Sequence, residues 1–286
     1  MMALFKPRMR GFRPPQSDFS TWEEVLVASA RVELTTFVTG RQKTTLGTLV
    51  SPAPGQASDL PLDEPVNSLV ICHALRHPLH GDMLIDAGLD RSFSIRPLGS
   101  IEGLAASRFV SPFSQGEGED LASQLSAAGI RPELVLFTHL HPDHTAGLED
   151  LGGSMPGICG RGEAPLRYWP FVFTRHLAGI TEMSLLDFRK AREMPLLGRC
   201  IDVFGDGSVW AVHTPGHTKG HVSYLAVSKD GPVLLVGDAS HTRIGFEQGI
   251  APGFSRNPAE ARASLGRLRA FAQAYPDTLL VFGHQL

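Results

Sequence analysis

His139-Leu140-His141-Pro142-Asp143-His144 is the stretch that decides the fold predicted for this 286-residue chain. It follows the apolar run at residues 134–137, which predicts a buried strand because it is short and partly β-branched and follows the turn signal Arg131-Pro132. In an extended backbone, His139 and His141 point to the same side, and Pro142 ends the strand because it has no N–H to donate. Three imidazoles and one carboxylate form a donor set that zinc binds. A lone histidine is usually a structural residue, but this cluster without a cation would bury several unpartnered polar groups.

Three later apolar runs also lead to residues that can bind a metal. Residues 209–213 precede His217, and Pro215 and Gly216 allow a sharp turn that leaves this imidazole projecting. Residues 233–236 precede Asp238, a carboxylate that needs a cation or hydrogen-bond donors in such a place. Residues 278–282 precede His284, which on its own would carry little weight. His213 and His221 flank the His217 turn, and we expect them to be structural hydrogen-bonding residues.

Composition narrows the class of protein. With 42% hydrophobic and 19% charged residues, the chain can bury a sizeable core, and a net charge of −3 makes nucleic acid a poor candidate partner. The three cysteines, Cys72, Cys159 and Cys200, are odd in number and widely spaced, which favours reduced, buried thiols and a cytoplasmic location. The basic N-terminus is not followed by an apolar segment, so we predict neither a signal peptide nor a membrane span.

Periodicity and turn residues predict the remaining elements. We expect an irregular arm at residues 1–20 and a single domain at residues 21–286. A helix over residues 119–128 would end at Gly129, and another would begin at Asn257-Pro258-Ala259-Glu260 with a cap and a proline in its first turn. Residues 22–30 are expected to form a helix or a strand, and residues 181–192 a helix. Strands are expected at residues 32–38, 66–72, 82–86 and 171–174, and loops at 51–65 and 147–162. Tyr168, Trp169 and Phe171 form an apolar aromatic cluster in the sequence.

The motif at residues 139–144 resembles the signature of the metallo-β-lactamase superfamily, and within it the chain is most similar to the N-acyl-homoserine lactonase family. The likeness covers most of residues 32–286 in the order of the elements, and the loop at residues 60–66 shares it. Its most specific parts are residues 139–144, 214–221, 237–240 and 283–284. The resemblance implies an α/β fold, a four-layer αββα sandwich built from two similar halves.

The resemblance also implies a site for two divalent metal ions, with zinc the expected metal. It assigns His139, His141 and His217 to one ion and Asp143, His144 and His284 to the other, with Asp238 bridging both. Asp86 follows a predicted strand and is not expected to be a ligand. It is either a residue of an ordinary turn or a carboxylate that holds a ligand imidazole or the metal loop in place.

In this family, two metals share a hydroxide that opens a lactone or ester, which makes N-acyl-homoserine lactones the leading substrates. By resemblance to the lactonases, Asp143 would carry a proton from the attacking water to the departing alkoxide. The lactonases place a tyrosine three residues after the bridging aspartate, where this chain has His241, an arrangement that also resembles the organophosphate-hydrolysing branch. We therefore expect His241 to hold the substrate oxygen, with a surface or packing residue as the alternative.

Two other functions are weighed against a lactonase or esterase. The first is a hydrolase of phosphotriesters, thioesters or β-lactams, although Asp238 is not part of the usual β-lactamase ligand set. The second is a binding or regulatory protein with a structural metal, against which seven candidate ligands argue, because structural zinc sites use four. We expect a small-molecule substrate, with neither nucleic acid nor membrane as a partner, and the sequence leaves a homodimer open.

Overall fold

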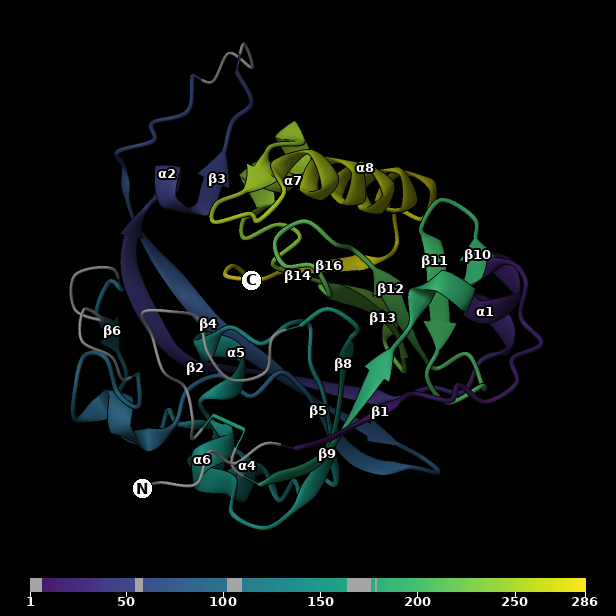
Figure 1. The fold of residues 1–286 in the computed structure, drawn as a ribbon, viewed down its shortest axis with the longest axis horizontal. Coiled ribbons are helices and arrows are strands. Elements are labelled where there is room, and N and C mark those ends of the chain that lie inside the picture. Colours follow the sequence, from purple (N-terminus) through teal and green to yellow (C-terminus); the bar gives the residue numbers. More distant parts are fainter. Residues whose placement is uncertain (1–6, 55–58, 102–109, 164–175, 178) are drawn as a thin grey trace.

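Two β-sheets lie face to face in the computed structural model, and helices cover the outer face of each (Figure 1). The structure describes residues 7–54, 59–101, 110–163, 176–177 and 179–286. The first sheet has the strand order β1-β9-β8-β7-β5-β4-β2-β6, and the second has the order β10-β11-β12-β13-β14-β16. This arrangement confirms the predicted αββα sandwich.

The first sheet consists of β1 (Arg8–Gly11), β2 (Glu33–Thr45), β4 (Pro65–His77), β5 (Gly81–Ile85), β6 (Phe113–Ser114), β7 (Leu134–Leu136), β8 (Met155–Gly160) and β9 (Ile180–Leu186). The second consists of β10 (Arg192–Met194), β11 (Gly198–Asp202), β12 (Val209–His213), β13 (Val222–Ser228), β14 (Gly231–Gly237) and β16 (Leu279–Phe282). A separate pair joins β3 (Val50–Ser51) to β15 (Ala251–Pro252). The helices are α1 (Trp22–Ala28), α2 (Leu46–Leu49), α4 (Leu121–Ala128), α5 (Pro142–Thr145), α6 (Leu148–Leu151), α7 (Arg243–Gln248) and α8 (Pro258–Ala274), with 3₁₀ turns η1 (Arg91–Ser94) and η2 (Phe188–Lys190).

Three apolar layers hold these four structural layers together. Between the sheets, Leu136 of β7 belongs to the same buried cluster as Val222 of β13. Phe271 of α8 belongs to the cluster on the outer face of the second sheet, and Leu121 of α4 to the one on the outer face of the first. Burial of this apolar area is the main stabilising contribution. It also fixes the strand ends from which the site is built.

Several local predictions are confirmed. The helix α4 starts after Asp120, whose side chain accepts a hydrogen bond from the Ser123 N–H, and it ends at Gly129. The helix α8 starts after Asn257, whose side chain accepts from the Glu260 N–H. In each case a short polar side chain satisfies a backbone donor at the helix start that has no partner within the helix. Residues 22–28 form a helix, and the strands predicted around residues 32–38, 66–72, 82–86, 134–137, 209–213, 233–236 and 278–282 are all present.

Three local predictions are wrong. Residues 181–192, expected to be helical, form β9, η2 and the start of β10, because β9 pairs with both β8 and β1 and tertiary context overrides local preference. Residues 147–162, expected to be irregular, contain α6 and β8. Gly160 serves close packing there, since a Cβ atom would lie 1.8 Å from the Gly220 carbonyl oxygen. The arm at residues 1–20 is not wholly irregular, because β1 forms by parallel pairing with β9.

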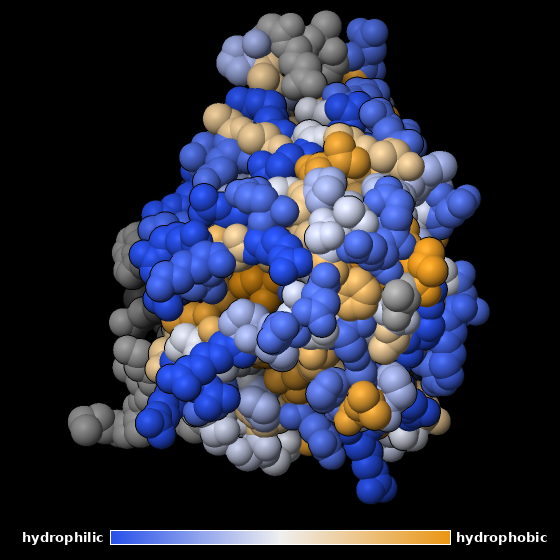
Figure 2. Space-filling model, turned by 90° about the vertical axis from the view of Figure 1, so that its right-hand side faces the viewer, coloured by the Kyte–Doolittle hydropathy of each residue, from blue (hydrophilic) through white to orange (hydrophobic). Residues whose placement is uncertain are grey.

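Other expectations have different outcomes. The strand predicted at residues 171–174 and the cluster of Tyr168, Trp169 and Phe171 lie outside the described residues. The three cysteines are free and buried, and burial raises the pKa of each thiol. Within the described ranges no helix is long and apolar enough to cross a membrane. Hydrophilic side chains cover most of the face in Figure 2, and hydrophobic ones form small separate patches between them.

Candidate metal centre

The predicted ligands meet at one edge of the sheet sandwich. His139 and His141 follow β7, and Asp143 and His144 lie in the short helix α5. The other three side chains come from loops that follow strands of the second sheet: His217 after β12, Asp238 after β14 and His284 after β16. Gly283 permits this approach, because a Cβ atom there would lie 2.2 Å from Asp238 Oδ1. The fold thus brings together all seven side chains named from the sequence.

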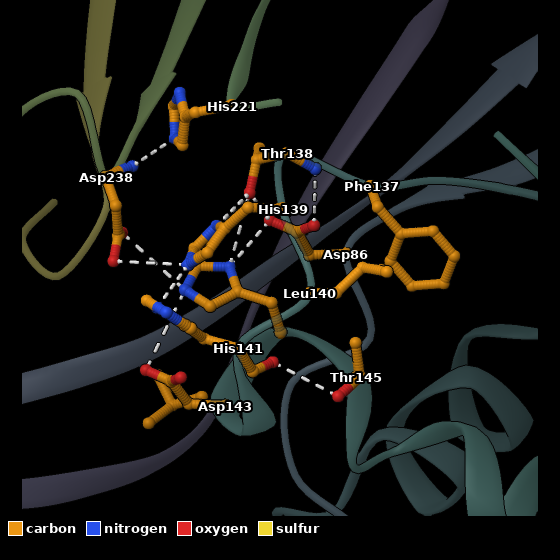
Figure 3. Close-up of polar contacts among 12 residues, drawn as sticks. Asp86, Phe137, Thr138, His139, Leu140, His141, Asp143, Thr145, His221 and Asp238 are labelled. Atoms are coloured by element: carbon orange, nitrogen blue, oxygen red, sulfur yellow. Dashed lines mark hydrogen bonds and ion pairs between the residues drawn. The ribbon is translucent and has the colours of Figure 1, made fainter. Parts of the chain in front are cut away.

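The first donor group contains His139, His141, His217 and Asp238, whose donor atoms all lie within 4.8 Å of one another. His141 Nδ1 lies 2.8 Å from His139 Nε2 and 3.0 Å from His217 Nε2. Asp238 Oδ2 lies 3.3 Å from His217 Nε2 and 3.7 Å from His139 Nε2. The labelled imidazoles of the motif gather between the carboxylates of Asp238, Asp143 and Asp86 in Figure 3. Such a convergence of nitrogens and a carboxylate would suit a divalent metal such as zinc.

A second group lies beside the first and contains Asp143, His144 and His284. Asp143 Oδ2 lies 3.7 Å from both His144 Nε2 and His284 Nε2. Asp238 reaches this group as well, with Oδ1 3.6 Å from His144 Nε2 and Oδ2 3.4 Å from His284 Nε2. The Asp238 carboxylate therefore lies between the two groups, in the place predicted for a bridging ligand.

Hydrogen bonds orient these imidazoles through their other ring nitrogen. His284 Nδ1 donates to the Leu69 carbonyl at 2.7 Å, and His144 Nδ1 lies 2.8 Å from Asp86 Oδ2. Asp86 also accepts hydrogen bonds from the backbone N–H and the hydroxyl of Thr138. Because Nδ1 is the donor, Nε2 of both rings keeps its lone pair for a cation. Asp86 thus holds the His144 imidazole and the start of the loop at residues 138–144, which is one of the two roles considered for it.

Burial and charge adapt these groups to metal binding. Burial lowers the pKa of His139 and His217 well below the usual value and that of His141 to about 4, so these rings are neutral near pH 7. Burial opposes ionisation of Asp238, but the surrounding imidazoles hold the pKa of this carboxyl well below its usual range. Burial likewise opposes protonation of His284, yet the Asp238 carboxylate raises the pKa of His284 to about 8. Neutral imidazoles and an ionised carboxylate are the forms that bind metals, so the first donor group is already in its binding form. At the second group, a divalent ion would have to displace a proton from His284.

Two buried polar atoms indicate where a cation is needed. His144 Nε2 and Asp238 Oδ1 have no hydrogen-bond partner among the described residues. Leaving a buried polar group unpaired costs about 1–3 kcal/mol, and more for a charged group. A divalent ion between the two donor groups would satisfy both atoms, so the residues present fit the metals that the sequence predicts.

His213 and His221, the two histidines predicted to be structural, are not part of the donor groups found among the described residues. His221 Nε2 accepts a hydrogen bond from the Asp238 backbone N–H at 3.0 Å, so its lone pair is already used, and Nδ1 lies 2.9 Å from Thr214 Oγ1. This confirms its predicted structural role. The His213 ring stacks on Phe188 with centroids 4.6 Å apart and lies outside the donor groups found among the described residues.

A further group of His77, His80 and Asp206 has the spacing of a metal site but not its chemistry. His77 Nδ1 accepts hydrogen bonds from the backbone N–H groups of Leu79 and His80. The proton must therefore be on Nε2, which donates to Asp206 Oδ2 at 2.8 Å. With both nitrogens occupied, His77 has no lone pair to offer a metal.

A buried chain of polar contacts beside α5 is absent from the predictions made from the sequence. Thr145 Oγ1 lies 3.1 Å from the His141 carbonyl oxygen and 3.2 Å from His176 Nδ1 (the contact between Thr145 and His141 is drawn in Figure 3). His176 Nε2 lies 2.9 Å from Ser100 Oγ, and the Ser100 hydroxyl donates to Asp90. These residues are far apart in the chain and form no recognisable motif, so the sequence holds no signal for the network.

A cavity of about 330 Å³ opens beside the donor groups, a size within the range for small-molecule sites. Asp143 and His241 line it next to the ligands, and apolar side chains form much of the remaining wall. These apolar residues are Leu49, Ile101, Val110, Phe113, Pro142 and Phe254. His241 Nδ1 donates to the Leu49 carbonyl at 2.8 Å, which aims Nε2 at Asp238 Oδ2, 3.2 Å away.

An αββα sandwich gathers imidazole and carboxylate donors at one edge, where they could hold divalent metal ions. The profile of the Metallo-beta-lactamase superfamily matches residues 62–284, and the chain belongs to this superfamily.

Curated relatives carry two kinds of name. An N-acyl homoserine lactonase from Bacillus sp. is 30% identical over 241 residues, which cover 82% of this chain and 84% of the relative. N-acyl homoserine lactonase AttM from Azorhizobium caulinodans is 30% identical over 59% of this chain, and a hydroxyacylglutathione hydrolase from Acidiphilium cryptum is 32% identical over 63%. The chain spans less than two thirds of these last two relatives, 65% and 60% of their lengths.

A solved structure of AiiA from B. thuringiensis, with N-decanoyl-L-homoserine at the active site, shares the fold. Its TM-score is 0.70 at 23% identity, and the match covers 90% of this chain and 94% of that one.

Proposed function

We propose that this protein is a dinuclear metal hydrolase that opens lactones or esters, with N-acyl-homoserine lactones as the leading substrates. The observation that carries the proposal is the seven-residue donor set beside a largely apolar cavity. Its two groups share Asp238, which favours two ions per chain, and the imidazole-rich donors favour zinc. The names of the lactonase relatives support the substrate class.

When bound, two divalent ions lower the pKa of water and polarise a carbonyl. The protein's own residues would then orient the substrate and move protons. The Asp143 side chain is 20% exposed, against 3% for Asp238, so Asp143 is open to the cavity and suited to carrying a proton from water to the leaving alkoxide. The apolar wall would hold an acyl chain.

Metal analysis and a substrate panel test this proposal together. Protein purified with metal supplied should contain two divalent ions per chain, most of them zinc when zinc is offered. The panel should contain lactones, esters, thioesters and phosphotriesters, and lactones should give the highest kcat/KM. Removal of the metal by a chelator should abolish hydrolysis, and re-addition should restore it. Two bound ions with no turnover of any substrate would favour the binding-protein alternative, and one ion or none would count against the dinuclear site.

His241 has a separate predicted role, to hold the substrate oxygen from the cavity wall. His241→Ala should keep both ions and lower kcat about 10²–10³-fold, the usual effect of removing one donor to a transition state. Because Nδ1 already donates to the Leu49 carbonyl, this role requires the protonated ring, in which Nε2 also carries a hydrogen. His241→Tyr should shift preference toward N-acyl-homoserine lactones. Steady-state kinetics and metal content of each variant check this, with His213→Ala as the control, because His213 lies outside the donor groups of the described chain.

Two outcomes would contradict the assigned role. If His241→Ala hydrolyses every substrate as fast as the parent protein, His241 is a packing residue. If the variant instead loses one metal ion, His241 is a ligand, as its grouping with Asp238 and His284 would allow. Preferential loss of phosphotriester turnover would favour the organophosphate-hydrolase alternative.

A further inference from the structure

Glu163 is a buried carboxylate that the chemistry proposed above does not use. Glu163 follows β8, and 8% of its surface is exposed to solvent. Oε1 accepts hydrogen bonds from the Thr218 hydroxyl at 2.5 Å and the Gly220 N–H at 2.9 Å. Oε2 accepts from the Leu140 N–H at 3.2 Å. The two oxygens of one carboxylate therefore bind two separate loops.

These two loops carry the imidazoles of the first donor group. Leu140 stands between His139 and His141, and Thr218 directly follows His217. The first loop follows β7 of one sheet, whereas the second joins β12 to β13 of the other. Glu163 thus joins the two sheets at the level of the ligands. Among the described residues, no hydrogen bond connects the Glu163 side chain to the second donor group.

The environment of Glu163 is unfavourable for an ionised group. Burial raises the pKa of this carboxyl, although the three hydrogen bonds partly oppose that effect. An ionised group in such surroundings is stabilised only when its hydrogen bonds are well formed. Loss of the carboxylate would leave the Leu140 and Gly220 N–H groups without this acceptor and would let the two ligand loops move independently.

We propose that Glu163 is a positioning residue that sets the affinity for the ion held by His139, His141 and His217. The inference rests on the proposed metal site. Residues that orient metal ligands typically change metal affinity 10–100-fold when they are mutated. Glu163 hydrogen-bonds to Leu140, between His139 and His141, and to the loop that carries His217, whereas Asp143 and His144 lie beyond Pro142 in α5. It should therefore affect one of the two ions selectively.

The chain contains a closely matched control in Asp202. This buried carboxylate also accepts one hydroxyl and two backbone hydrogen bonds, from Ser17 Oγ at 2.8 Å, Gly205 N–H at 2.9 Å and Gly207 N–H at 2.9 Å. Its loop precedes β12, whereas the His217 loop follows that strand, so the two loops lie at opposite strand ends. Asp202→Asn therefore removes a similar buried carboxylate away from the ligands.

The test is a stepwise zinc titration of the metal-free proteins against a chromophoric chelator, together with thermal unfolding of the same samples. Glu163→Ala should weaken the affinity for one zinc ion about 10–100-fold and leave the affinity for the other within a few-fold of the parental value. Glu163→Gln should be intermediate, because its amide retains one accepting oxygen for one loop. Asp202→Asn should lower the unfolding midpoint and leave both affinities unchanged. His284→Ala impairs the second site, so the double variant with Glu163→Gln reports on the first site alone. Its affinity for the remaining zinc ion should be lower than that of His284→Ala.

The outcomes separate this inference from the proposed function. If the parent protein binds two ions and hydrolyses substrate while both Glu163 variants bind zinc like Asp202→Asn, the positioning role is wrong and the proposed function stands. Equal weakening of both ions would also overturn the inference, since it would indicate a general structural role. A parent protein that binds no divalent ion would overturn both. Should Glu163→Ala fail to fold, Glu163→Gln decides.

Discussion

Replacement of Asp143 by Asn should lower kcat about 10²–10⁴-fold, the usual contribution of a positioned acid–base group. Asn has nearly the same shape but cannot carry a proton. Asp143 combines contact with the cavity and proximity to the imidazoles of two candidate ligands, His144 and His284, at 3.7 Å from each. The kcat of Asp143→Asn should be measured at saturating metal on the best substrate of the panel, because the substitution should also weaken metal binding.

Asp150→Asn is the matched control for this prediction. Asp150 lies in the neighbouring helix α6, and its carboxylate accepts a hydrogen bond from the Arg91 N–H. This control should keep the parental kcat. If Asp143→Asn with two bound ions were as fast as the parent protein, Asp143 would not be the proton carrier. If its activity returned fully at high zinc, its contribution would be metal binding alone.

Deletion of the last three residues, which removes His284, should lower occupancy of the second ion and nearly abolish turnover. The loss should be at least as large as the roughly 10²–10³-fold effect of removing one transition-state donor, because a ligand is removed with its ion. His284 Nε2 lies within 4 Å of both Asp143 and Asp238, at 3.7 and 3.4 Å. Metal content and kcat of the truncated protein check this expectation.

A shorter truncation provides the control. Removal of Gln285 and Leu286 eliminates the contacts of Gln285 with the backbone N–H groups of Arg243 and Phe282 but keeps His284. That protein should retain both ions and most of its activity, whereas His284→Ala in the full chain should reproduce the longer deletion. Full metal content and full activity in His284→Ala would remove His284 from the site.

Local patterns were sufficient where a residue's neighbours in sequence decide its environment. The run at residues 134–137 forms β7 and its buried continuation, and the alternation of His139 and His141 directs both imidazoles to one point. The caps of α4 and α8 form because a side chain meets a backbone N–H three residues away. Such interactions need no distant partner, and they were predictable from the sequence.

Elements that depend on a distant partner were not predictable in this way. The strand β1 has only four residues and exists because β9 accepts it in parallel pairing about 170 residues further along the chain. The same pairing, together with β8, makes residues 180–186 a strand, although a helix is predicted at residues 181–192. Glu163 has no sequence signal, because its partners are the backbone of one loop and residues of another.

The sequence by itself therefore determined the identity of the seven candidate ligands and, through its resemblance to a known superfamily, the αββα fold. Tertiary structure alone decided which nitrogen His221, His241 and His284 present. The carbonyls of Leu49 and Leu69 orient His241 and His284 across 192 and 215 residues of chain, and a backbone N–H occupies the lone pair of His221. A histidine offers a metal only the nitrogen that its other hydrogen bond leaves free, and that hydrogen bond exists only once the sheets have packed.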